Sequence, residues 1–86
     1  DETARTVLET AAQTLSALGQ WTSDAIEQSL RVLPESLALK PKVVFQIIRL
    51  ATTGSLVSLP LFESLALLGG EQTVARLRAA KDLVGG

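Results

Sequence analysis

Apolar residues recur at three- and four-residue steps along most of this chain, which is the spacing of one face of an α-helix. The pattern is clearest in residues 4–18, where alanines and leucines form a single stripe. Thr3 suits the N-cap of this helix, and Gly19 suits a left-handed stop at its end. We therefore predict a first amphipathic helix, whose small alanines permit close approach by a neighbouring helix.

A second helix is predicted from the residues around Trp21. With Thr22 as N-cap, Trp21 and Ile26 have the spacing of a hydrophobic staple. Trp21 is interpreted as a core anchor in preference to a stacking platform for a base, because tryptophan is largely buried on average. Pro34 cannot sit in a helix interior, so the helix should end or kink at Leu33 and residues 35–39 should form a turn.

The densest apolar segment follows, between a proline that suits the first turn of a helix and a glycine that suits its end. It predicts a helix from Pro41 to Thr53, ended by Gly54. This helix is apolar nearly all round and also carries Arg49, whose charge must be paired or reach a binding surface. Its two apolar faces consist of Val44, Ile48 and Ala51 on one side and Val43, Ile47 and Leu50 on the other.

Two further helices complete the predicted fold. Ser58 is a natural N-cap with Pro60 in the first turn, and this helix should end at residues 69–70. The last helix should cover residues 71–83. Together the segments predict an all-α fold, a compact bundle of about five short helices, that forms one domain over residues 1–86.

Composition excludes several kinds of site. The chain has no cysteine and no histidine, so neither disulfides nor thiolate or imidazole metal sites are available. We find no catalytic constellation, and we predict a binding domain that is not an enzyme and has no catalytic residue, metal or cofactor. No apolar run reaches the length of a membrane span, and the first residues do not resemble a signal peptide. A cytoplasmic location without membrane contact is expected.

Charge is distributed unevenly along the chain. Residues 1–39 carry a net charge of −4, and residues 40–86 carry +3. A basic half is compatible with binding to phosphate groups. Ordinary solvated surface charge explains the same distribution equally well.

The second half also contains a series of short motifs in a specific order. They resemble the C-terminal end of bacterial glutamyl-tRNA synthetases, which are class I aminoacyl-tRNA synthetases. The upstream Trp21-Thr22 also fits that family. The matching residues are Lys40, Pro41, Phe45, Arg49, Ala51, Thr53, Gly54, Ser58, Leu61, Phe62, Glu63, Leu67, Leu68, Gly69, Arg76 and Leu77.

This resemblance implies a helical anticodon-binding subdomain, a fragment of a larger synthetase-like chain without its catalytic half. The implied partner is the anticodon loop of tRNA-Glu. By the same resemblance, the residues that face that loop are Gln46, Arg49, Ser58 and Leu61.

The chain also departs from the family pattern on this face. Ile47 and Leu59 stand where the family has proline, and the lead-in is less basic than expected. These changes add apolar surface, whereas RNA binding gains from cations. An alternative hypothesis therefore stays open: an engineered or diverged scaffold that binds a protein partner through the former anticodon face. This face would comprise Gln46, Ile47, Leu50, Leu56 and Leu59.

Overall fold

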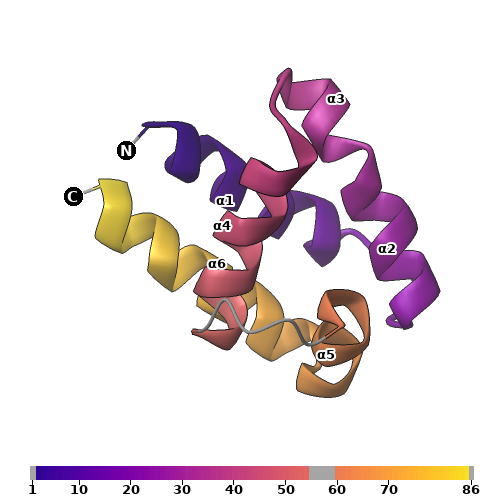
Figure 1. The fold of residues 1–86 in the computed structure, drawn as a ribbon. Helices are drawn as coiled ribbons and strands as arrows, with labels where there is room; N and C mark the ends of the chain where they lie inside the picture. Colours follow the sequence, from indigo (N-terminus) through magenta and orange to yellow (C-terminus); the bar gives the residue numbers. More distant parts are fainter. Residues whose placement is uncertain (1, 55–59, 86) are drawn as a thin grey trace.

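The computed structural model describes residues 2–54 and 60–85, and every regular element in these two ranges is a helix. The predicted all-α fold is confirmed. In chain order the elements are α1 (Glu2–Ser16), α2 (Ser23–Arg31), α3 (Leu33–Leu37), α4 (Pro41–Thr53), α5 (Leu61–Leu68) and α6 (Gly70–Gly85) (Figure 1).

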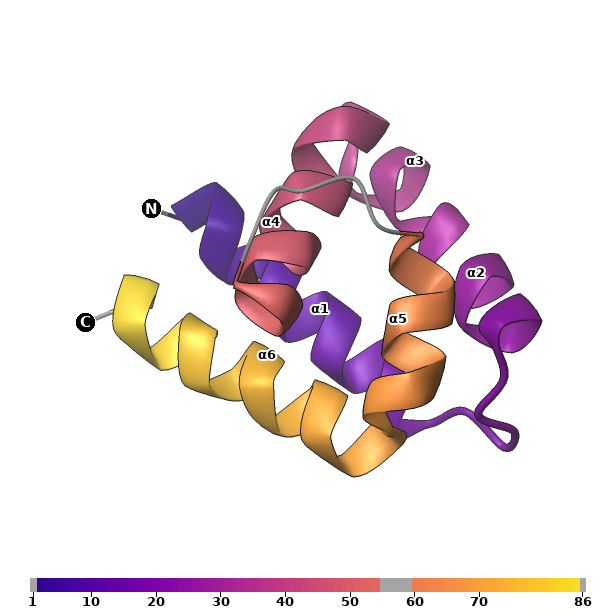
Figure 2. The same cartoon turned by 60° about the horizontal axis from the view of Figure 1, so that its bottom comes forward.

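The helices are arranged around the pairing of the first with the last. α1 and α6 lie side by side and antiparallel, so the two ends of the chain come out at the same end of the molecule (Figures 1 and 2). α4 packs across both of them. α2 and α5 pack against each other at the far end from the termini (Figure 2). One side of α4 therefore contacts α1 and α6, and its opposite side faces outward.

The core is built from apolar side chains at helical spacing on these elements. α1 buries five residues, including Ala11 and Ala12, and lies directly along α6 as its small residues allow. Burying one leucine or isoleucine side chain contributes about 1.5–3 kcal/mol, so this set supplies most of the driving force. The buried apolar residues are Val7, Leu8, Ala11, Ala12, Leu15, Ile26, Leu30, Leu33, Val44, Ile48, Leu61, Leu65 and Leu77.

Several predicted helix ends are confirmed. The Thr22 hydroxyl oxygen accepts a hydrogen bond from the Ala25 backbone N–H at 3.1 Å, as an N-cap should. α4 has the predicted bounds, with Pro41 in its first turn. Gly54 follows with a φ of 74°, a left-handed conformation that glycine adopts without steric penalty.

The turn expected over residues 35–39 is wrong, because the chain there forms the short helix α3. Pro34 lies in its first turn, where a missing N–H costs nothing. The proline thus starts a new helix directly after α2 instead of opening a turn. Ala38 then ends α3 with a φ of 57°, held by its backbone N–H bonding to the carbonyls of Pro34 and Glu35.

Other predicted helix ends also differ. α1 begins at Glu2, so Thr3 lies within the helix and is not its N-cap. α6 covers Gly70–Gly85 and is longer than the predicted 71–83. α1 stops at Ser16, and the following backbone N–H groups bond back three residues, so the chain turns before Gly19, which is not left-handed. α5 begins at Leu61 with Pro60 in the N-cap position, later than expected. Ser58 itself lies outside the described residues.

Candidate functional site

The outward side of α4 carries the polar residues predicted for binding. Gln46 is exposed and Arg49 is half-buried, and their spacing of three places them on neighbouring turns of the same side. The backbone carbonyl of Arg49 accepts a hydrogen bond from the Thr53 hydroxyl at 2.7 Å, which ties it to the last turn of the helix. The structure thus brings Gln46 and Arg49 together on one surface.

Arg49 also lines a surface hollow of about 320 Å³ where α2, α4 and α5 meet. Two aromatic rings and a second arginine lie in the same lining. Its volume is at the lower end of the range for small-ligand sites. The lining consists of Glu27, Arg31, Phe45, Arg49, Pro60, Leu61, Phe62 and Glu63.

Contacts across this hollow join the three helices. The rings of Phe45 on α4 and Phe62 on α5 meet edge to face, with centroids 5.8 Å apart and planes at 88°. The Arg31 guanidinium carbon lies 5.6 Å from the centroid of the Phe62 ring. Arg31 Nε donates to Glu27 Oε2 at 2.6 Å within α2. The sequence motifs do not point to Arg31, because it precedes the matching segment.

The end of α4 is held by a bond from α6. Arg76 Nη1 donates to the backbone carbonyl of Thr52 at 2.7 Å. A cation at this position satisfies one of the carbonyls left open at a helix C-terminus and complements the helix dipole. Arg76, named above among the residues that match the family motifs, therefore has a structural role at the end of α4.

The other predicted site residues are placed differently. Only 4% of Leu61 is exposed, so its side chain belongs to the core, although it contributes to the lining of the hollow that contains Arg49. Ser58, Leu56 and Leu59 lie outside the described residues. Ile47 is half-buried against the core, and Leu50 is 55% exposed.

Ile47 and Leu50 line a second, apolar groove of about 410 Å³ between α1, α4 and α6. Leu83 and Val84, both exposed, stand on its α6 side. Three residues of the set predicted for a protein partner are described, and two of them, Ile47 and Leu50, share this surface, whereas Gln46 does not line it. It is a different surface from the hollow that contains Arg49.

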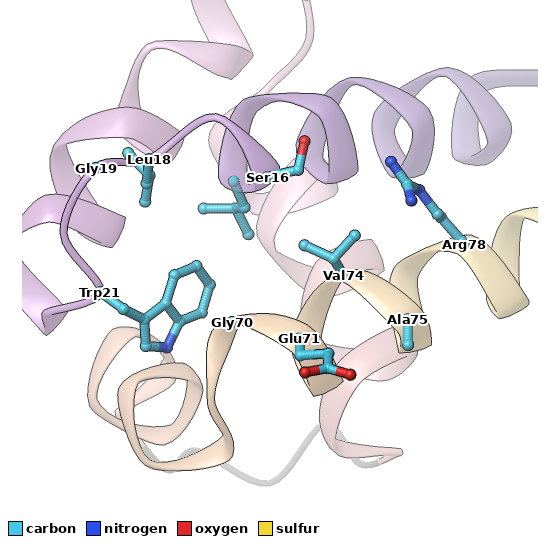
Figure 3. Close-up of a pocket in the computed structure, with 10 residues that line it drawn as sticks. Ser16, Leu18, Gly19, Trp21, Gly70, Glu71, Val74, Ala75 and Arg78 are labelled. Carbon is cyan, nitrogen blue, oxygen red and sulfur yellow. The ribbon is translucent and has the colours of Figure 1, made fainter.

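Trp21 is a structural anchor, as predicted. Figure 3 shows its indole ring beside a hollow of about 550 Å³ between the end of α1 and the start of α6. Its Nε1 donates to the Leu65 carbonyl at 2.9 Å, which ties the turn after α1 to α5. The ring lies directly against Gly70, where an added Cβ would come within 3.2 Å of it. Both partners fix the ring in the fold.

Comparison with known proteins identifies the family. A model described as an anticodon binding domain matches residues 1–81. The chain belongs to this anticodon-binding family. It is 53% identical over 79 residues to a glutamate–tRNA ligase of Mycolicibacterium smegmatis, which covers 91% of this chain and 16% of that protein. It is 51% identical over 80 residues to a glutamate–tRNA ligase of Mycobacterium tuberculosis, covering 92% of this chain and 16% of the relative.

The resemblance to glutamyl-tRNA synthetases is thereby confirmed. The anticodon-binding domain matches a non-catalytic part of its relatives and spans 16% of their length. The alternative hypothesis of an engineered or diverged scaffold that binds a protein is not supported over an anticodon-binding domain. No described helix has the length and apolar character that crossing a membrane requires. Residues 2–54 and 60–85 also contain no acidic cluster arranged to hold a metal ion.

Proposed function

We propose that this anticodon-binding domain binds the anticodon loop of a tRNA through the outward side of α4, and that the tRNA is tRNA-Glu. The observation that carries the proposal is the position of Arg49, half-buried on α4 at a hollow lined by two aromatic rings. The family supplies the class of ligand, and the glutamate–tRNA ligase relatives suggest the tRNA. Residues 1–86 would act as one non-catalytic domain of a longer cytoplasmic ligase.

The chemistry of this surface suits a single-stranded RNA loop. Unstacked bases are read through hydrogen bonds to their edges and through stacking on aromatic or guanidinium planes. Arg49 supplies N–H donors for a base edge or a phosphate, and Gln46 supplies an amide with both a donor and an acceptor. Ser58 keeps its predicted role as a hydrogen-bonding residue on the basis of the resemblance alone. Leu61 is given no role in contact with RNA.

The test is binding of a labelled anticodon stem-loop to the wild-type chain and to Arg49→Gln. Loss of a direct contact should weaken binding about tenfold, since such an arginine contributes about 1–3 kcal/mol. Arg5→Gln is the matched control, because Arg5 is an exposed arginine on α1, outside the lining of the hollow. Equal affinity for wild type and Arg49→Gln would disprove the assigned role of Arg49.

The choice of tRNA requires a second comparison. Stem-loops with the anticodon of tRNA-Glu and with unrelated anticodons should be measured at the same salt concentration, because phosphate contacts alone bind all of them equally. Preference for the tRNA-Glu loop supports the proposal. Equal binding would leave a domain that holds RNA without reading its sequence.

A further inference from the structure

Arg31 is a second arginine at the hollow that contains Arg49, and it comes from a different helix. It lies in the last turn of α2, whereas Arg49 lies near the end of α4. The side chain of Arg31 is 61% exposed, yet two contacts fix its direction: the Nε bond to Glu27 and the position over the Phe62 ring. A long side chain held this way loses less conformational freedom when it binds a ligand.

These two contacts determine which part of the guanidinium remains for a ligand. The guanidinium carbon lies over the Phe62 ring, and the Nε–H donates to Glu27. No further hydrogen bond of Arg31 is found within the described part of the chain, so the N–H donors of its two terminal Nη groups remain for a ligand. Parallel in-plane donors match the oxygens of a phosphate.

We propose that Arg31 binds a backbone phosphate of the RNA whose anticodon loop lies on α4. This inference rests on the proposed function and extends the interface from α4 across the hollow to α2. Arg49 and Arg31 line one hollow, so a loop that reaches Arg49 passes within range of a second cation. Phosphate contacts of this kind fix the position and orientation of the nucleic acid, while base contacts read its sequence.

Two carboxylates in the same lining act against an anion. Glu27 is paired with Arg31 through Nε, and this pairing offsets part of the charge of both groups. Glu63 is exposed in the first turn of α5 and repels a phosphate from that side. The proposal therefore makes opposite predictions for the two signs of charge: neutralising Arg31 weakens RNA binding, and neutralising Glu63 strengthens it.

The experiment measures the affinity of the anticodon stem-loop between 50 and 200 mM salt. Removing one phosphate contact in a single-stranded region lowers the salt slope by about 0.7, so Arg31→Gln should weaken binding about eightfold at 50 mM and about threefold at 200 mM salt. Arg31→Lys retains a cation and should keep the wild-type slope. Arg5→Gln makes the same charge change outside the hollow and should leave the slope unchanged.

Other outcomes would overturn the inference. If Arg31→Gln weakened binding without a change in slope, Arg31 would act only by holding Phe62. An equal effect of Arg5→Gln would show a general response to net charge, and weaker binding by Glu63→Gln would contradict a phosphate at this place. A blunt RNA duplex of equal length, bound with the same Arg31 dependence, would show that the site is not specific for the loop.

The proposed function can fail separately. If the wild-type chain does not bind the stem-loop, both ideas are wrong. If Arg49→Gln weakens binding and Arg31→Gln does not, only the inference about Arg31 is wrong. Circular dichroism of each variant checks that the helices are intact. We expect them to be, because the substituted side chains are all at least partly exposed.

Discussion

The two sides of α4 differ in what they contribute to the molecule. Val44 and Ile48 on the inward side are completely buried, and Thr52 continues the same line one turn later. The outward side carries Gln46 and Leu50, both exposed, beside the half-buried Arg49. One helix thus anchors the fold with one side and presents the proposed RNA contacts with the other. Stability and binding should therefore respond to different substitutions on the same element.

The largest expected effect is on the inward side. Ile48→Ala should lower the free energy of unfolding by about 2–5 kcal/mol, because it removes buried methyl groups and leaves a cavity. Leu50→Ala removes similar groups from a side chain that is 55% exposed, and it should cost less than about 1 kcal/mol. Urea unfolding followed by circular dichroism measures both. Similar losses of unfolding free energy in the two variants would contradict the proposed difference between the two sides of α4.

A smaller effect is expected at the end of α4. Arg76→Gln removes the donor to the Thr52 carbonyl and the cation beside the helix C-terminus, so it should destabilise the fold by about 1 kcal/mol. Arg78→Gln is the matched control on the same helix, because Arg78 is exposed and no hydrogen bond or ion pair of it is found among the described residues. If Arg76 acts structurally, its replacement leaves the salt slope of RNA binding unchanged. A slope change as large as that expected for Arg31→Gln would instead make Arg76 an RNA contact.

Effects of about the same size or smaller are expected at two buried hydroxyl groups. Thr52 Oγ1 donates to the Ile48 carbonyl at 2.8 Å, whereas Thr73 Oγ1 on α6 finds no partner in the part of the chain that the structure describes. Replacement by valine keeps the shape of the side chain and removes the hydroxyl. We expect Thr52→Val to destabilise the fold by about 0.5–1 kcal/mol and Thr73→Val to stabilise it by about 1 kcal/mol.

Thermal unfolding of the two valine variants, beside the wild type, checks the sign of each change. A loss of stability in Thr73→Val would mean that its hydroxyl has a partner, such as an ordered water, that satisfies it. A loss of similar size in both variants would show that both hydroxyls are hydrogen-bonded in the folded state.

The features predicted correctly from sequence are those set by local chemistry. Pro41 and Gly54 determine the bounds of α4 because one lacks an N–H and the other tolerates a positive φ. Thr22 caps α2 because its hydroxyl reaches a backbone N–H only three residues away. Pro34 shows the limit of such rules, since a proline that ends one helix is equally suited to begin the next.

The rest depends on contacts between residues that are distant in the sequence. Leu61 was expected to face a ligand, but α5 packs against α2 and buries it. Arg31 and Phe62 meet only because those two helices are neighbours, so no motif within either helix indicates the pair. Arg76 was identified only as a match to the family motifs, and only the fold shows the carbonyl that it binds.

Trp21 gives the molecule an internal spectroscopic probe. It is the only tryptophan, and the chain has no tyrosine, so fluorescence excited near 280 nm comes from this ring alone. Because its indole is bonded to the Leu65 carbonyl and packed on Gly70, unfolding exposes it to water and shifts its emission. Trp21 is not among the residues that line the hollow with Arg31 and Arg49. Tryptophan emission should therefore follow unfolding while a labelled RNA reports binding, both in the same sample.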